Sequence, residues 1–494
     1  MSHSVPDAMH SLPLRGLTAR PNYHWFVVAT VCIGAFMAAL DASIVTVAQP
    51  AIQAKFHTTV SAVEWVALAY LLTLTALLAM FGRLSDILGR RPLYTIGFSV
   101  FIVGSALCGA SQSLAFLIVM RILQSVGAVM LQANSVAIIT AAVPESVRGK
   151  AIGIQGSALA VGLSLGPTIG GLLIAGFGWR AIFYVNVPVG IIGTTLAALI
   201  LPRDKLRETA RKERFDYLGA VTLAIALVGM MLGLNQGNSR GWASPFILAS
   251  FAAGVLFTLL FIAIEKRHPS PLVDLSLFKI EQWTWGNISG SLSYALMYGV
   301  LYVVPYFFED VMGRSAAQAG LLTTPLPVGM MLLAPIAGRI SDRFGSRGPT
   351  TVGMIVSTVA AAGLVLISLQ VSYIYLIAAL LLIGVGMGVF TPPNNSSVMG
   401  ASPRNRLGVS SGILNMSRSL GQSFGIAYAF TILEGVMLTM GYGSFQAPHA
   451  DLIVAFRWSF AAVALLGVFA ALISALRGNV AKSETSAEAH AIEI

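Results

Sequence analysis

The feature that most constrains this chain is a succession of long apolar stretches. A helix that crosses a bilayer needs about 20 mainly apolar residues, and the sequence contains fourteen such stretches separated by short polar connections. Lipid permits only helices or closed barrels, and these stretches are too long and alternate too weakly for barrel strands. We therefore predict an all-α polytopic membrane protein with helices near residues 26–48, 63–81, 93–112, 115–141, 151–175, 181–201, 217–237, 245–264, 286–307, 319–338, 350–369, 374–399, 409–433 and 455–476.

The composition supports a lipid environment, because 56% of the residues are hydrophobic and only 10% are charged, unlike an ordinary soluble protein. The 30 Lys and Arg residues against 20 Asp and Glu give a net charge of +10. Most basic residues fall in the tails and in alternate loops, and such loops face the cytoplasm. We expect a protein of the cytoplasmic (inner) membrane with both termini in the cytoplasm, whose basic loops meet lipid headgroups and not nucleic acid.

The sequence carries no signature of a metal or nucleotide site. Cys32 and Cys108 lie in apolar stretches, which argues against a disulfide or a metal centre. There is neither an H-E-x-x-H motif nor a Walker-type phosphate loop. The string GLSLG fits the G-x-S-x-G hydrolase pattern, but Ser164 lacks the strand-to-helix elbow that this pattern requires. We expect no metal, no cofactor, no enzymatic activity and no cleaved signal peptide.

The chain contains an internal repeat. GRLSDILGRR, which starts at Gly82, recurs as GRISDRFGSR, which starts at Gly338. Five further positions match in a single register, in which Pro144, Gly149, Gly153, Gly162 and Gly166 pair with Pro403, Gly408, Gly412, Gly421 and Gly425. Parallel repeats of this kind place a binding site between two halves near the membrane midplane. We predict six-helix halves at 26–201 and 286–476, tails at 1–25 and 477–494, and a linker at 202–285 whose two extra helices act as a spacer.

Six motifs follow one another in a specific order. They are LDASIVTVAQP (40–50), GRLSDILGRR (82–91), RILQSVGA (121–128), GLSLGPTIGG (162–171), WRAIFYVNVPVG (179–190) and PRNRLGVSSGILNMSRSLG (403–421). Together they resemble the fourteen-helix drug:proton antiporters of the major facilitator superfamily, although Gln49 and Ser125 depart from that pattern. The resemblance implies a proton-coupled antiporter that exports lipophilic, often cationic, drugs or biocides by alternating access. It also implies function as a monomer, with room for accessory export proteins.

Two ionisable residues lie inside predicted membrane helices at the same depth. Asp41 and Arg121 are each six or seven residues from the outer end of their helix, which is roughly 10 Å at a rise of about 1.5 Å per residue. A charge there is costly and therefore indicates a function. We predict that Asp41 carries the proton and that Arg121 acts on it directly or through Gln124. The alternative is a static pair that holds two helices together.

Further acidic candidates lie near the outer ends of two helices. Glu64 lies near the outer end of the second apolar stretch, and Glu309 and Asp310 lie at the outer end of the ninth. A second acidic group would strengthen coupling to protons and binding of cations, but all three are equally well interpreted as solvated charges at the membrane rim.

A tyrosine stripe runs along the ninth stretch. Tyr294, Tyr298, Tyr302 and Tyr306 recur every four residues and so share one helix face. By the repeat this helix corresponds to the one that carries Asp41, and we expect both to face a central cavity, where aromatic rings hold a cation or a flat ring system. Ordinary helix packing is the alternative. Asp41, Trp65 and Tyr70 are further candidates for the substrate-binding wall.

Two groups of residues are candidates for conformational gating. Gly162, Gly166, Gly170 and Gly171 permit close helix packing beside a bend at Pro167. The repeated loop motif supplies the second group, which consists of Gly82, Asp86, Gly89, Arg90, Arg91 and Asp342. The resemblance implies that the first copy of this motif stabilises an outward-open state. The alternative is a solvated loop whose charges only set the topology.

Other functions remain open at the level of sequence. The runner-up within transport is an exporter of one endogenous metabolite or an uncoupled facilitator. A membrane-embedded enzyme or sensor on a transporter-like scaffold is the alternative from a different class, and binding without translocation would distinguish it.

Overall fold

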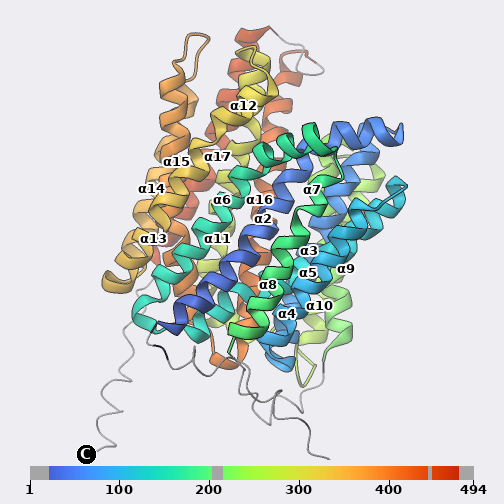
Figure 1. The fold of residues 1–494 in the computed structure, drawn as a ribbon. Coiled ribbons are helices and arrows are strands. Elements are labelled where there is room, and N and C mark those ends of the chain that lie inside the picture. Colours follow the sequence, from blue (N-terminus) through green and yellow to red (C-terminus); the bar gives the residue numbers. More distant parts are fainter. Residues whose placement is uncertain (1–19, 21, 203–214, 443–447, 478–494) are drawn as a thin grey trace, which may run out of the picture.

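The computed structural model describes residue 20 and residues 22–202, 215–442 and 448–477, and it is helical without strands in these parts. The first half comprises α2 (Tyr23–Phe56), α3 (Val60–Leu88), α4 (Arg90–Gly109), α5 (Leu114–Ala142), η2 (Glu145–Val147), α6 (Arg148–Phe177), α7 (Ala181–Tyr184) and α8 (Asn186–Ile200). The extra pair comprises α9 (Tyr217–Arg240) and α10 (Pro245–Glu265). The second half comprises η4 (Leu275–Lys279), α11 (Glu281–Tyr306), the π-helical turn η5 (Phe307–Val311), α12 (Ala316–Thr323), α13 (Pro325–Phe344), α14 (Arg347–Gly363), η6 (Leu364–Leu366), α15 (Tyr373–Gly400), η7 (Arg404–Arg406), α16 (Leu407–Thr439) and α17 (His449–Leu476). The helices form one elongated bundle (Figure 1).

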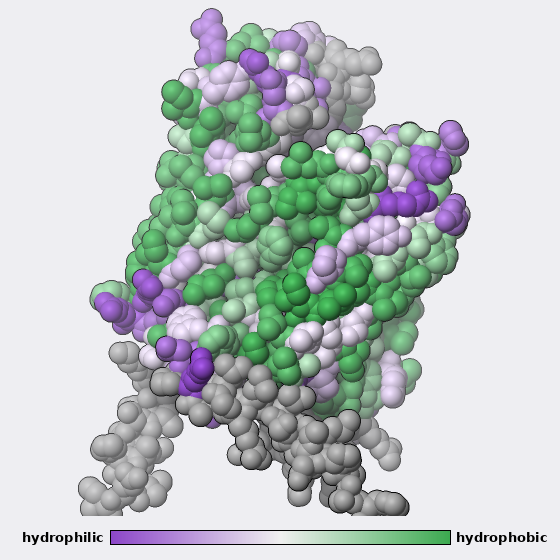
Figure 2. Space-filling view, viewed as in Figure 1, coloured by the Kyte–Doolittle hydropathy of each residue, from purple (hydrophilic) through white to green (hydrophobic). Residues whose placement is uncertain are grey.

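The prediction of an all-α multi-pass membrane protein is confirmed. Thirteen helical segments of the described chain are long and apolar enough to cross a membrane. The remaining predicted helix, at 409–433, is α16, which is 33 residues long but includes Asn415, Arg418 and Glu434. It packs in the interior against α3, α5, α11 and α17. A broad apolar band covers the visible face of the bundle, and polar side chains gather toward both ends (Figure 2).

Most helices extend beyond the predicted apolar stretches. α2 runs on to Phe56 and α17 begins at His449, because a helix continues through polar residues that an apolar window excludes. The ends carry ordinary capping signals. Ser113 and Ser244 cap the first turns of α5 and α10 through their side chains, which satisfies backbone donors that would otherwise lack partners. The boundaries of the six-helix halves remain predictions, and most residues of the two tails lie outside the described chain.

The repeated glycines Gly89 and Gly345 permit two very tight connections. Gly89 alone separates α3 from α4, and Gly345 follows the last residue of α13. Their φ angles are 97° and 85°, in a region that other residues rarely adopt. The repeat in the sequence therefore encodes the same reversal of direction in both halves.

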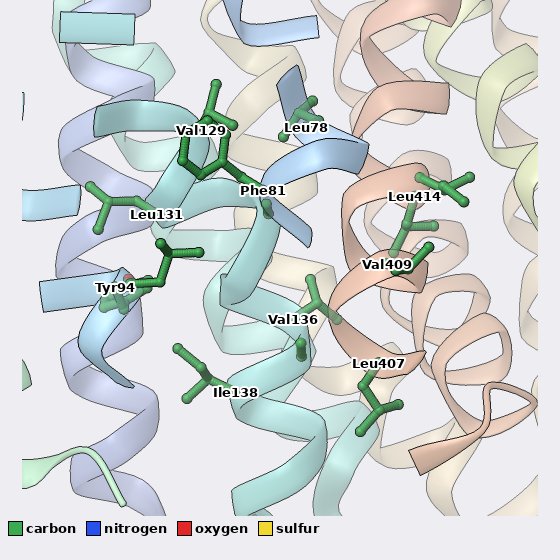
Figure 3. Packing of buried hydrophobic residues seen from close by; sticks show 14 of the residues in the cluster. Leu78, Phe81, Tyr94, Val129, Leu131, Val136, Ile138, Leu407, Val409 and Leu414 are labelled. Atoms are coloured by element: carbon green, nitrogen blue, oxygen red, sulfur yellow. The ribbon is translucent and has the colours of Figure 1, made fainter. Parts of the chain in front are cut away.

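The two halves meet at one end of the bundle, which we call the basic end. It carries the short connections after α3, α5, α13 and α15. A side chain on Gly82 would overlap the backbone of Gly408, and one on Gly338 would overlap the backbone of Gly149. Figure 3 shows the first seam from close by, with Leu78 of α3 beside the start of α16. Toward the opposite end the two groups of helices diverge (Figure 1).

The extra helices lie across one of the two seams between the halves. α9 packs against α3 of the first half and against α16 of the second. Leu68, Leu72 and Met231 form a small apolar cluster there. Asn235 Nδ2 donates to Ser423 Oγ at 3.4 Å, and Thr431 Oγ1 donates to Asn238 Oδ1 at 3.0 Å. The extra pair was interpreted as a spacer, and α9 in addition contacts both halves.

We predict that Gly338→Leu separates the halves at the basic end, because the new side chain has no room against Gly149. Nitroxide labels at Leu88→Cys and Phe344→Cys, both exposed, report this by pulsed electron paramagnetic resonance in a background without Cys32 and Cys108. The label distance should lengthen and its distribution broaden. Gly348→Leu is the control, since a side chain there meets nothing. An unchanged distance in Gly338→Leu would contradict this packing.

Candidate functional site

Asp41 of α2 lies at the centre of a fully buried polar cluster. Its Oδ2 accepts a hydrogen bond from Arg121 Nη1 at 2.7 Å. Its Oδ1 accepts from Gln124 Nε2 at 2.8 Å and from Asn186 Nδ2 at 2.9 Å. The side chain of Asp41 is 0% exposed and that of Arg121 is 1% exposed. The prediction that Asp41 and Arg121 share one depth is confirmed, and Gln124 contacts both of them.

Arg121 is fixed by contacts from several helices. Its Nε donates to the carbonyl oxygen of Val66 at 3.2 Å, and its guanidinium lies 4.2 Å from the ring centroid of Tyr70. Tyr70 was predicted to line the substrate wall, and the structure places it, 1% exposed, against Arg121 instead. A planar guanidinium bonded at its edge and covered on its face has little freedom to move.

Sequence reasoning missed Asn186 and Ser105 as members of this cluster. Asn186 donates to Asp41 and also to Ser105 Oγ at 3.1 Å. Ser105 in turn donates to the carbonyl oxygen of Phe183 at 2.8 Å. Asn186 was visible within the motif at 179–190, but a single amide inside an apolar stretch does not indicate which charge it serves.

The donors around Asp41 include a cation, and hydrogen bonds that involve charged groups are about twice as strong as neutral ones. The guanidinium also cancels the negative charge, so the cluster as a whole is neutral. In this state every carboxylate oxygen is bonded and none reaches solvent. Exchange of a proton or contact with a substrate at Asp41 therefore requires the cluster to open.

The tyrosine stripe of α11 forms a ladder of stacked rings. The ring centroids of Tyr294 and Tyr298 are 6.3 Å apart, and those of Tyr298 and Tyr302 are 6.0 Å apart, with interplanar angles of 22° and 25°. Tyr294 is buried, whereas Tyr302 and Tyr306 are each 42% exposed. The ladder thus runs from the interior toward the end where the halves diverge.

The three outer carboxylates come together near the end of this ladder. Glu64 of the first half and Glu309 and Asp310 of the second all lie close enough to Tyr306 to act electrostatically on its phenol. Trp65, the neighbour of Glu64, packs against the apolar cluster at α9. The structure therefore groups these acids opposite the basic end, far from Asp86 and Asp342.

Asp86 and Asp342 make equivalent bonds at the basic end. Asp86 accepts from the backbone N–H groups of Gly408 and Val409 at 2.8 and 3.0 Å. Asp342 accepts from those of Gly149 and Lys150 at 2.7 and 3.0 Å. Each carboxylate thus crosses the seam to the first turn of a helix in the other half, where the helix dipole favours a negative charge.

Of the two arginines of the first loop motif, Arg90 reinforces this closure, whereas Arg91 bonds within the first half. Arg90 lies 3.5 Å from Asp86 and also donates to the carbonyl oxygen of Arg404 at 3.5 Å. Arg91 donates to the carbonyl oxygen of Ala198 near the end of α8. Positive side chains at a helix C-terminus complement its dipole.

The glycine motif of α6 packs within one half in this conformation. Side chains on Gly162, Gly166 or Gly170 would meet α2 at Phe36, Ser43 or Ile44, whereas Gly171 faces open space beside the exposed Pro167. Gly153, earlier on α6, is the residue that approaches α13 of the other half. Ser164 donates to the carbonyl oxygen of Ala160 along the helix. Among the described residues no three His, Cys, Asp or Glu side chains gather to hold a metal.

We predict that Arg121→Gln destabilises the fold strongly, because it leaves the Asp41 charge buried without its cation. Removing one partner of a buried ion pair costs about 3–5 kcal/mol, which thermal unfolding in detergent would detect. Asp41→Asn combined with Arg121→Gln should recover part of the loss. Arg314→Gln, which removes a charge that is exposed, is the control. Equal stability of the wild type and Arg121→Gln would show that the guanidinium does not compensate the buried carboxylate.

Comparisons with known proteins agree with this architecture. Residues 31–426 match the family model of the Major Facilitator Superfamily. The riboflavin transporter RibZ of Clostridioides difficile (strain 630) is 35% identical over 448 residues, which cover 90% of this chain and 96% of that protein. The tetracenomycin C resistance and export protein of Streptomyces glaucescens is 31% identical over 426 residues, which cover 86% and 78%. The crystal structure of the human organic anion transporter MFSD10 shares the fold, with a TM-score of 0.68 at 15% identity, and covers 92% of this chain and 100% of that one.

The described helices, the repeated halves that meet at the basic end and the match over most of the sequence lead to one conclusion. This chain is a multi-pass membrane protein that belongs to the major facilitator superfamily of transporters.

Proposed function

We propose that this protein is a proton-coupled antiporter that exports lipophilic small molecules across the bacterial cytoplasmic membrane. The observation that carries the proposal is the buried Asp41–Arg121 pair, because an intramembrane carboxylate with a cation partner is the usual device of proton relays in transporters. Export is supported by the similarity to the tetracenomycin C protein, which is a resistance and export protein.

The cluster offers a way to bind and release a proton. When Arg121, Gln124 and Asn186 all donate to Asp41, the ionised carboxylate is favoured. A movement of α5 or α8 relative to α2 would remove these donors and open a path by which a proton from the aqueous phase reaches the carboxylate. The neutral, protonated carboxyl group is then favoured, and return of the donors releases the proton.

Alternating access would use the seam at the basic end. The excess of Lys and Arg in its loops supports a cytoplasmic location of this end. The bonds of Asp86 and Asp342 close that side, so the described conformation corresponds to an outward-facing state. Opening to the cytoplasm requires both carboxylates to leave the helix N-termini. Because the hydrogen bonds of Asp86 and Asp342 have similar geometry, the two pairs of bonds can break together.

A dedicated metabolite exporter is the second candidate. RibZ, which is similar over nearly its whole length, is a transporter of riboflavin, a single metabolite with a flat ring system. The stacked tyrosines of α11 offer flat surfaces that suit such a ring. The proton-coupling proposal holds for either substrate range.

We predict that Asp41→Asn abolishes proton-coupled transport, since an amide cannot carry the proton. Purified protein is reconstituted in liposomes with an imposed pH gradient, and a fluorescent substrate and internal pH are followed together. In the wild type, the substrate and protons should cross the membrane in opposite directions. In the variant, the pH gradient should drive no movement of the substrate, and the substrate should drive no movement of protons. Glu145→Gln, an exposed residue of the basic end, is the control. Full coupled activity of Asp41→Asn would refute the assignment.

We also predict that Asp86→Asn and Asp342→Asn each favour the cytoplasm-open state, because a neutral amide interacts more weakly with a helix N-terminus. The label pair at Leu88 and Phe344 should show a longer-distance population in either variant and a larger one in the double variant. If the double variant keeps the distance of the wild type, these carboxylates do not close the seam.

A further inference from the structure

A second arginine lies deep in the membrane region and has no acidic partner among the residues that the structure describes. Arg418 is on α16, eleven residues from its first residue at the basic end, which corresponds to roughly 16 Å at about 1.5 Å per residue. This depth is near the middle of the hydrocarbon region. A guanidinium at that depth is costly and indicates a function. The proton-coupling proposal gives Arg418 no role.

The surroundings of Arg418 leave most of its charge uncompensated. The side chain is 8% exposed, and Nη1 donates to Asn415 Oδ1 at 3.1 Å. Its guanidinium carbon lies 5.3 Å from the ring centroid of Tyr294. Within the described chain, the other N–H groups of Arg418 have no hydrogen-bond partner and no carboxylate lies within ion-pair distance. Arg121 differs sharply, because Asp41 lies 2.7 Å from it.

The other charged residue of α16 and the acids at the outer end of α11 are too far along the bundle to neutralise Arg418. Glu434 is on the same helix but sixteen residues further, about 24 Å away along the axis. Glu64, Glu309 and Asp310 gather around Tyr306, twelve residues beyond Tyr294 on α11, or about 18 Å along that helix. The middle of the bundle therefore carries a net positive charge at this point.

Arg418 lies where the two halves face each other. Asn415, its hydrogen-bond partner, also donates to the carbonyl oxygen of Gln132 in the first half at 3.0 Å. Met416 and Leu420, on either side of Arg418, pack against the large apolar core to which both halves contribute. The guanidinium also acts electrostatically on Tyr298. The cation thus stands at the inner end of the tyrosine ladder, at the level where repeated transporters bind their substrates.

We infer that Arg418 and the ladder of Tyr294, Tyr298 and Tyr302 recognise planar aromatic compounds that carry a negative charge, such as a carboxylate or an acidic phenol. The stacked rings supply flat apolar faces and phenol donors. The guanidinium supplies the paired donors that suit a carboxylate. This inference rests on the proposed transport function and specifies its substrate class. It replaces the sequence-based expectation of cationic substrates, because a cation would meet Arg418 as a like charge and would find Asp41 already neutralised.

The test compares two dyes that share one ring system. Fluorescein is an anionic xanthene near neutral pH, and rhodamine 123 is a cationic one. Binding of each to the purified full-length protein in detergent is measured by fluorescence anisotropy without a gradient. We expect fluorescein to bind at least about tenfold more tightly, since a buried charge contact is worth more than one factor of ten. Equal binding, tighter binding of rhodamine 123 or no binding of fluorescein would overturn the inference.

Variants assign the preference to Arg418. Arg418→Gln should weaken fluorescein binding by about tenfold or more and leave rhodamine 123 binding unchanged or improved. Arg418→Lys keeps the charge but not the paired donors, so it should lose less fluorescein affinity than Arg418→Gln and still prefer fluorescein to rhodamine 123. Arg314→Gln, which removes an exposed cation near Tyr373, should change neither. Unaltered fluorescein binding in Arg418→Gln would show that the preference arises elsewhere. If Arg418→Gln does not fold, the dye preference of the wild type and the Lys variant decide the question.

The outcome is separable from that of the proton-coupling test. Loss of dye discrimination with intact dependence on Asp41 would refute the substrate class alone. Discrimination between the dyes without proton movement in liposomes would refute the coupling alone.

Discussion

The absence of water inside the bilayer governs every polar feature of this protein. A backbone or side-chain group that leaves water there must find a partner within the chain or carry a large cost. The helices satisfy the backbone, and the Asp41 cluster shows the same rule applied to charge, with three donors around one carboxylate. Against this background an uncompensated group is informative. Arg418 is such a group, and its lack of an acidic partner is the basis for assigning it to substrate binding.

The same constraint explains how the halves can close without being locked. Across the seam, glycine permits backbones to touch, and each touching pair is accompanied by a carboxylate bonded to a helix N-terminus. These acceptors lie at the basic end, near the membrane surface, where water can replace the lost hydrogen bonds when the seam opens. A closure built from apolar side chains alone would have no hydrogen bonds for water to replace. The arrangement occurs twice because of the internal repeat, in which equivalent residues recur at the same positions of both halves.

The helices, the repeat and the central pair were predictable because each depends on spacing along the chain. Fourteen apolar stretches give helices, and distance from a helix end gives the shared depth of Asp41 and Arg121. Partners that arise from the rotation of helices about their axes were not predictable. Asn186 and Ser105 are ordinary polar residues until packing brings Asn186 to Asp41 and Ser105 to Asn186. Tyr70 is directed to Arg121 by the same effect. The isolation of Arg418 could not be predicted from the sequence, because it depends on which side chains do not lie near it in the fold.

The position of α9 makes the two sides of the molecule unequal toward lipid. The seam between α3 and α16 is covered by α9, whereas the seam between α6 and α13 makes no comparable contact with the extra pair in the described chain. A lipophilic compound dissolved in the bilayer therefore meets an extra helix on one side and a direct boundary between halves on the other. When the halves rock, α9 must slide along at least one of them, while α6 and α13 part without an extra helix across them. Lateral entry from a membrane leaflet would then be one-sided, which gives the direction of substrate loading a structural origin apart from the chemistry of the binding wall.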